Sequence, residues 1–176
     1  PDVEITAQPH EPVRILNEFE PVTVTEPKPG LRIYDFGTSM AGFCRVRLKA
    51  PAGASVKLRY AEALNPDGTL YVGNLNGLYD NFDQYILDGE GPLEVRPDFT
   101  YHGFRYVETT GDLEKVKIEH ITALDISSDL KKTAFFESSD PRLNKLVEII
   151  DRAYRANTPS VNVDCAGRDE RQSWMG

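Results

Sequence analysis

The chain has 176 residues, 40% of them hydrophobic, and its 28 acidic and 20 basic side chains give a formal net charge of −8. This balance argues against a nucleic-acid partner, because a phosphate backbone is bound through clustered basic side chains. No apolar run approaches the roughly 20 residues that a membrane-spanning helix needs, so no membrane partner is expected. The first residue is Pro1, from which we expect a missing or processed natural start. A cytoplasmic and an exported location both remain open.

The first segments predict a linker followed by short strands. Residues 1–11 are polar and proline-punctuated, which is typical of a linker. Strand patterns then recur at residues 13–16, 22–25, 32–36, 43–48 and 56–60. Val46 and Leu48 alternate with charged neighbours, which predicts one buried and one wet face. This spacing favours an antiparallel β-sandwich, jelly-roll-like, over residues 12–127.

A polar, glycine-rich stretch interrupts the strands at residues 65–80. Its start, Asn65-Pro66-Asp67-Gly68, is a strong turn signal. The stretch is interpreted either as a solvated excursion or as a contact across a domain interface, made by the polar and aromatic residues Tyr71, Asn74, Asn76 and Tyr79. Strands are predicted again at residues 83–87, 93–95, 105–110 and 116–126.

The segment 101–106 is dense in aromatic residues and allows two interpretations. Its rings could form a platform that stacks on sugars. We favour a hairpin corner at which Gly103 permits a bend, the rings enter the core, and His102 bonds a backbone carbonyl. The cysteines Cys44 and Cys165 show no metal or disulfide spacing, so two unpaired thiols are expected.

Residues 140–156 predict an amphipathic helix. Asp140 followed by Pro141 is typical of a helix start. Apolar residues then recur at helical spacing, and Glu148 can pair with Arg152 four residues on. The apolar stripe needs a partner, so residues 128–176 are interpreted as the start of a helical domain.

The last thirteen residues, 164–176, hold three carboxylates, two arginines and the single tryptophan of the chain. An acid, charged groups that hold hydroxyls, and an apolar ring face are the parts of a glycoside hydrolase subsite. Both carboxyl groups of such an enzyme rarely come from one short segment, so a second one is expected from a distant part of the protein. The alternative is a solvated surface loop whose charges pair with each other.

This stretch resembles the signature of the inverting α-L-rhamnosidases of bacteria and fungi, which reads roughly Asp-Cys-Pro-x-Arg-Asp-Glu-Arg-x-Gly-Trp-x-Gly-Asp. Ala166, Gly167 and Ser173 depart from it. The segments 34–43, 61–71 and 99–108 fit the same family, so the resemblance covers about residues 12–176. The matching signature residues are Asp164, Cys165, Arg168, Asp169, Glu170, Arg171, Trp174 and Gly176.

The resemblance implies a β-sandwich followed by the first helix and active-site loop of a truncated (α/α)6 barrel. It implies hydrolysis of terminal non-reducing α-L-rhamnose with inversion, without a cofactor or metal. Glu170 is then the general acid, while the general base lies on a later segment. The implied partners are a rhamnose-containing glycoside and the rest of the barrel, and this chain alone is expected to be inactive. The implied substrate-binding residues are Asp164, Arg168, Asp169 and Trp174.

Two rival functions remain open from the sequence. The chain could be a non-catalytic carbohydrate-binding or structural β-sandwich. It could also belong to another (α/α)6-barrel glycosidase or to a carbohydrate lyase. The spacing of Arg168, Glu170 and Trp174 favours the rhamnosidase.

Overall fold

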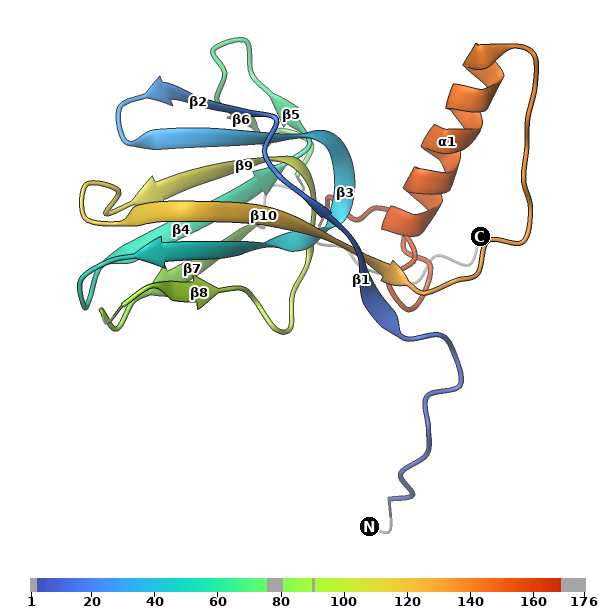
Figure 1. Cartoon of the computed structure of the whole chain (residues 1–176), viewed down its shortest axis with the longest axis horizontal. Helices are drawn as coiled ribbons and strands as arrows, with labels where there is room; N and C mark the ends of the chain where they lie inside the picture. The colour runs from blue at the N-terminus through green and yellow to red at the C-terminus, as the bar shows by residue number, and fades with distance from the viewer. Residues whose placement is uncertain (1–2, 76–80, 90, 169–176) are drawn as a thin grey trace.

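The computed structural model describes residues 3–75, 81–89 and 91–168 (Figure 1). The described part is mainly β, as predicted, with a single helix after the last strand. The elements are β1 Val13–Phe19, β2 Thr23–Lys28, β3 Leu31–Lys49, β4 Ser55–Ala61, β5 Ala63–Leu64, β6 Leu70–Tyr71, β7 Phe82–Ile86, β8 Leu93–Val95, β9 His102–Gly111, β10 Lys117–Ser128 and α1 Pro141–Ala156.

The strands form one curled antiparallel sheet and a small hairpin (Figure 1). The main path runs β1-β10-β3-β9-β4-β7, and β2 and β8 also pair with β3. The first part of β3 pairs with β2, and its last part pairs with β10 and β8. The predicted antiparallel β architecture is therefore confirmed. The predicted boundaries at residues 11/12 and 127/128 stay predictions.

Strand β3 corrects one expectation from the sequence. The segments 32–36 and 43–48 were expected as separate strands, but they belong to one strand of 19 residues. Its pairing with β9 shifts register between Asp35 and Met40. Gly37 lies there with φ +76°, and its N–H donates to an oxygen of Asp35 at 2.7 Å. Because glycine adopts this conformation without strain, the strand bends without reversing direction.

The core lies inside the curl of the sheet. The alternation predicted around Val46 and Leu48 of β3 is confirmed, because both side chains are completely buried, as is Leu58 of β4. Phe104 of β9 is also completely buried, and its ring packs edge-on against Tyr60 at 4.9 Å between centroids. These side chains belong to the larger of two apolar clusters, and the smaller one consists of Ile33, Ala61 and Leu70.

The aromatic segment enters the core, but not as the predicted corner. Gly103 lies inside β9, paired with Ala41 of β3, so there is no hairpin bend. His102 is buried, and its Nε2 lies 3.1 Å from a carboxylate oxygen of Asp83 rather than from a backbone carbonyl. The other oxygen of Asp83 accepts the Tyr60 hydroxyl at 2.7 Å. The side chains of Tyr60, Asp83 and His102 thus form a buried polar cluster that links β4, β7 and β9.

The hairpin β5–β6 was not predicted as strands, but its turn was. Gly68 donates to the carbonyl oxygen of Asn65 at 2.9 Å and has φ +82°. Tyr71 is 43% exposed, whereas Asn76 and Tyr79 lie outside the described residues. The two interpretations of this stretch therefore stay open.

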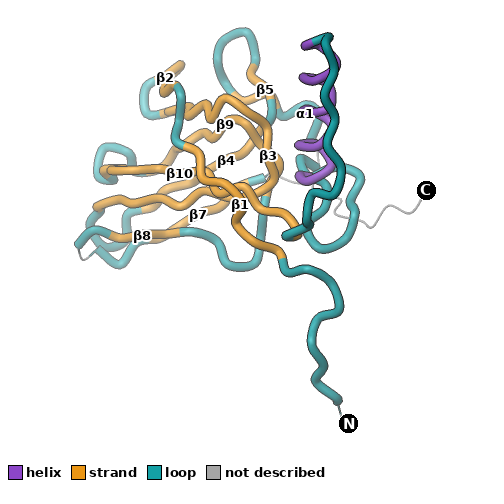
Figure 2. The backbone as a smooth tube through the Cα atoms, turned by 45° about the vertical axis from the view of Figure 1, so that its right-hand side comes forward, coloured by secondary structure: helices purple, strands orange, loops and turns teal. Residues whose placement is uncertain are grey.

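Helix α1 begins where the sequence predicts and stands beside the bend of β3 (Figures 1 and 2). Asp140 accepts the Arg142 N–H at 2.9 Å, and Pro141 occupies the first turn. The predicted pair between Glu148 and Arg152 is present at 3.4 Å. None of the side chains of the helix is buried. Within the described residues, no helix is long and apolar enough to cross a membrane.

Candidate functional site

The site is built around residues 157–168, called the site loop, which follows α1 directly. The end of β10 fixes the start of this loop. The Ser127 hydroxyl donates to the Arg155 carbonyl at 2.8 Å, and the Ser128 N–H donates to the Thr158 carbonyl at 3.0 Å. These two hydrogen bonds attach the last turn of the helix and the start of the loop to the sheet, and Thr158 is buried there.

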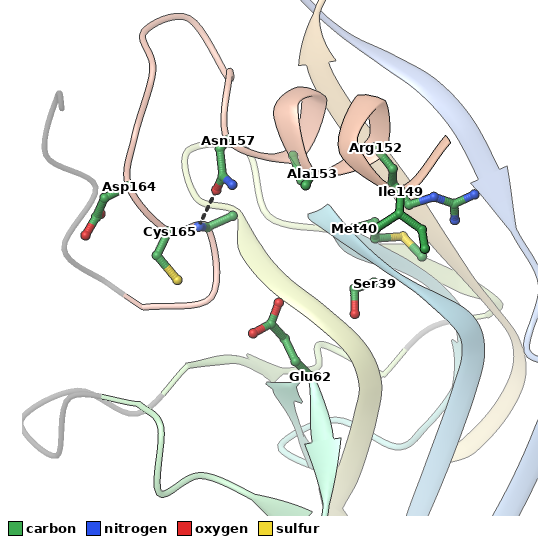
Figure 3. Close-up of a pocket in the computed structure, with 11 residues that line it drawn as sticks. Ser39, Met40, Glu62, Ile149, Arg152, Ala153, Asn157, Asp164 and Cys165 are labelled. Atoms are coloured by element: carbon green, nitrogen blue, oxygen red, sulfur yellow. Dashed lines mark hydrogen bonds between the residues drawn. The ribbon is translucent and has the colours of Figure 1, made fainter. Parts of the chain in front are cut away.

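Asn157, the last residue of the helix cap, folds the site loop back on itself. Its carbonyl oxygen accepts the Val163 N–H at 2.9 Å. Its side-chain oxygen accepts the Ala166 N–H, also at 2.9 Å (Figure 3). A single residue therefore satisfies two backbone donors and closes a compact loop.

The sheet contacts the far end of the site loop. The side-chain amide of Asn81 donates to the Gly167 carbonyl at 2.7 Å. The backbone of Ala166 and Gly167 also rests on Gly103 of β9. On its other side, Gly167 faces the carboxylate of Glu62, which follows β4. The loop thus lies against residues that are far apart in the sequence.

A pocket of about 220 Å³ opens between the bend of β3, the end of α1 and the site loop (Figure 3). Figure 3 shows the Glu62 carboxylate directed toward the part of the loop that carries Cys165. Polar and apolar side chains both line the pocket, as in sites that hold a small polar ligand. The lining residues are Ser39, Met40, Glu62, Ile149, Arg152, Ala153, Ala156, Asn157, Asp164, Cys165 and Ala166.

The structure places two of the predicted site residues. Asp164 lines the pocket, and its carboxylate lies 4.0 Å from the guanidinium of Arg168. Their side chains are 25% and 43% exposed, so both can reach a ligand as well as each other. Asp169, Glu170 and Trp174 lie outside the described residues. Cys44 and Cys165 are both free thiols, as predicted.

Sequence reasoning missed four residues that shape this site. Glu62 lies in the segment 61–71, which carries the family resemblance, and nothing else in the sequence pointed to a role for it in the site. Gly103 was noticed for a bend that does not exist. Asn81 and Asn157 carry no local pattern, because their partners lie elsewhere in the chain. Among residues 3–75, 81–89 and 91–168, no group of three or more His, Cys, Asp or Glu side chains could hold a metal ion.

Comparison with known families identifies this arrangement. Residues 25–127 match the model described as the bacterial alpha-L-rhamnosidase concanavalin-like domain. Residues 131–176 match the bacterial alpha-L-rhamnosidase 6 hairpin glycosidase domain. The chain belongs to the bacterial α-L-rhamnosidase family. The predicted family is thereby confirmed, and so is the assignment of α1 to the beginning of the helical glycosidase domain.

Curated relatives and solved structures agree with this placement. The chain is 44% identical over 173 residues to an alpha-L-rhamnosidase of Streptomyces avermitilis, covering 98% of this chain and 17% of that protein. An alpha-L-rhamnosidase of Alteromonas sp. (strain LOR) is 34% identical, with 95% and 18% covered. The S. avermitilis alpha-L-rhamnosidase complexed with L-rhamnose superposes with a TM-score of 0.88, covering 97% of this chain and 16% of the other. The enzyme from Dictyoglumus thermophilum, 34% identical, gives 0.87, with 94% and 19% covered.

Proposed function

We propose that this chain is part of an α-L-rhamnosidase that hydrolyses terminal non-reducing α-L-rhamnose with inversion. The observation that carries the proposal is the signature at residues 164–176, which lies in the segment that matches the glycosidase domain of the family. The chain spans about a sixth of the length of the relatives named above, so the activity belongs to a longer protein. The substrate is a rhamnose-containing glycoside.

The signature provides the acid half of the reaction. Glu170 donates a proton to the glycosidic oxygen as the bond to the anomeric carbon breaks. A carboxylate from a later barrel segment accepts a proton from water, which attacks the opposite face of the sugar. Inverting enzymes separate these carboxyl groups by about 6.5–9.5 Å to leave room for that water. Residues 1–176 alone therefore give no turnover, because they lack the general base.

The other signature residues hold the sugar in this proposal. Asp164 and Arg168 bind its hydroxyls, and this role is supported because Asp164 lines the pocket and the Arg168 guanidinium lies 4.0 Å from its carboxylate. Asp169 contributes a further carboxylate, and the Trp174 ring covers an apolar sugar face. Neither a cofactor nor a metal ion takes part.

As a general acid, Glu170 must hold a proton near neutral pH, so its pKa has to lie above the ordinary value. A neighbouring negative charge raises the pKa of an acid, whereas a neighbouring cation lowers it. Asp164 and Glu62, which line one pocket, are the candidates for such a negative charge, and Arg168 is a candidate for the opposing cation. The pH dependence of hydrolysis should therefore show an acid limb from the general base and a basic limb from Glu170.

Glu170→Gln in the complete enzyme tests the acid role. We expect kcat/KM for an alkyl rhamnoside to fall by about 10²–10⁴-fold, because the amide cannot protonate the leaving oxygen. A rhamnoside with a strongly acidic phenol as leaving group should lose much less, since that group leaves without protonation. The matched control is Glu148→Gln, the same change at a carboxylate on α1 that pairs with Lys145. Equal rates in Glu170→Gln and the wild type, with the alkyl substrate, would remove Glu170 from this role.

The stereochemical course is tested separately. Proton NMR of the reaction mixture should show β-L-rhamnose as the first product of an α-rhamnoside, before mutarotation mixes the anomers. Initial release of the α anomer would indicate a covalent intermediate and contradict inversion.

A further inference from the structure

We infer that Asn81 and Gly103, both from the β part of the chain, are positioning residues for the catalytic signature. They hold the backbone at Gly167, three residues before Glu170. This inference rests on the proposed function, since it assigns the two residues a role in the same reaction.

Asn81 is fixed by the core and binds the site loop directly. Its side chain is only 5% exposed. The backbone carbonyl oxygen of Asn81 accepts the N–H of Tyr60, a completely buried residue, at 2.9 Å. Its amide donates to the Gly167 carbonyl at 2.7 Å in a buried setting. Removing the donor leaves a buried carbonyl without this partner, which opposes the present loop position.

Gly103 provides the space that this position needs. A Cβ atom there would lie 2.5 Å from the carbonyl carbon of Ala166 and closer still to the nitrogen of Gly167. Gly103 does not have a positive φ and pairs as an ordinary strand residue with Ala41. Its backbone conformation therefore does not require glycine. The requirement comes from the close approach of the loop backbone to the strand.

Gly167 is confined on two sides by these contacts. Asn81 and Gly103 hold it from the sheet, and a Cβ atom at Gly167 would lie 2.9 Å from a Glu62 carboxylate oxygen. Asn157 fixes the preceding residue, Ala166, from the helix end. The chain therefore enters the later part of the signature from Gly167, a point that is fixed against the sheet. Catalytic groups must be held to within about 0.5 Å, and a misplacement of about 1 Å can lower a rate by about 10²-fold.

The test compares Asn81→Ala, Asn81→Asp and Gly103→Ala in the complete enzyme. Asn81→Asp keeps the size of the side chain but removes the donor and opposes the Gly167 carbonyl with a negative charge. We expect kcat for an alkyl rhamnoside to fall by about tenfold or more, with a smaller change in KM. The loss should shrink with an acidic phenol as leaving group, as for Glu170→Gln, because it arises from misplaced proton donation. A merely structural role would not produce this dependence on the leaving group.

Two matched controls separate positioning from folding. Asn65→Ala removes a side-chain amide that bonds the Leu70 carbonyl at 2.9 Å, in the β5–β6 hairpin. Gly111→Ala lies at the far end of β9, where a Cβ atom would meet the Ser55 carbonyl oxygen at 2.6 Å. Both should lower the unfolding temperature and leave kcat within about twofold of the wild type. If Asn81→Asp and Gly103→Ala also keep a wild-type kcat, the inference is overturned.

A second measurement does not depend on enzymatic activity. In residues 1–176, hydrogen exchange at the Ala166 amide, which donates to the Asn157 side chain, reports whether the site loop keeps its closed conformation beside the contact from Asn81 to Gly167. We expect exchange about tenfold faster in Asn81→Asp and unchanged in Asn65→Ala. Unchanged exchange in Asn81→Asp overturns the inference. A wild-type complete protein that cleaves no rhamnoside, combined with faster exchange in Asn81→Asp, would instead reject the proposed function while supporting the contact.

Discussion

The pair between Asp35 and Arg105 joins two segments that carried the family resemblance. The guanidinium donates from Nε and Nη2 to the two oxygens of Asp35, each at 2.8 Å. Asp35 also accepts the Gly37 N–H at the bend of β3. These hydrogen bonds, led by that from Arg105, hold the pKa of Asp35 below its ordinary value, against the opposing effect of partial burial. The pair therefore fixes β3 against β9 where the strand changes direction.

Asp35→Asn should lower the free energy of unfolding by about 1–2 kcal/mol near neutral pH, because a two-pronged charged hydrogen bond is lost at a partly exposed site. The folded-state pKa lies below the unfolded value, so this contribution is present above about pH 4 and is lost as the pH falls through the folded pKa. Urea unfolding at about pH 7 and about pH 3 should show the difference between wild type and variant shrinking.

Glu18→Gln is the matched control, because Glu18 is half exposed and pairs with Arg45 by one short contact at 2.6 Å and one long contact at 3.4 Å. Its effect should stay below about 1 kcal/mol. A difference for Asp35→Asn that persists undiminished in acid would contradict the charged-pair explanation.

Helix α1 is attached to the sheet by polar contacts of its C-terminal part rather than by its apolar face. Asp140 caps its start, and Ser127 binds its last turn. Leu146 and Ile150 are 50% and 57% exposed. This is the arrangement expected of a helix whose partner is another helix of a barrel.

Leu146→Ala therefore should have different effects in two settings. In residues 1–176 the change in unfolding free energy should stay within about 0.5 kcal/mol, since little apolar surface is lost from the interior. In the complete enzyme we expect about 2–4 kcal/mol, because neighbouring helices cover the same side chain. Thermal and urea unfolding of both forms measure this. Leu124→Ala, at a completely buried position of the sheet, should lower the free energy of unfolding strongly both in residues 1–176 and in the complete enzyme. Equal small effects of Leu146→Ala would show that this face stays uncovered.

The elements predicted correctly were those set by local patterns. Asp140 and Pro141 define a helix start within a few residues, and the alternation around Val46 and Leu48 defines a strand face. The merged strand β3 was missed because Gly37 can bend a strand as well as end it. The contact from Asn81 to Gly167 spans 86 residues, and no local pattern encodes it. The signature residues were found by resemblance, whereas the residues that hold them required the fold.

At the scale of the whole chain, the sheet contains its own core. The main apolar cluster comes from the strands and the loops between them, from Tyr34 to Ala123. Among the described residues after β10, only a few side chains are buried, namely those of Thr158, Pro159, Val163 and Ala166. The sheet therefore does not depend on the helix for most of its buried surface.

A polypeptide of residues 3–128 should fold by itself. We expect cooperative thermal unfolding and a β-type circular dichroism spectrum, with a midpoint several degrees below that of residues 1–176 because the loop contacts are lost. Calorimetric titration with L-rhamnose should give no binding heat, since the pocket wall formed by Asp164 and Cys165 is missing. Non-cooperative unfolding would refute the independence of the sheet. Measurable rhamnose binding would favour the carbohydrate-binding alternative.

The central strand β3 has a consequence for biosynthesis. Arg32 pairs with Thr109, and Lys49 pairs with Lys117, so most of its neighbours are translated long after it. Until the ribosome has added β9 and β10, only the short pairings with β2 and β8 can satisfy parts of its hydrogen-bonding edges. Contacts of such large sequence separation slow folding and leave apolar strands unpaired in the meantime. The nascent polypeptide must therefore avoid aggregation by β3 until more than 100 residues have emerged.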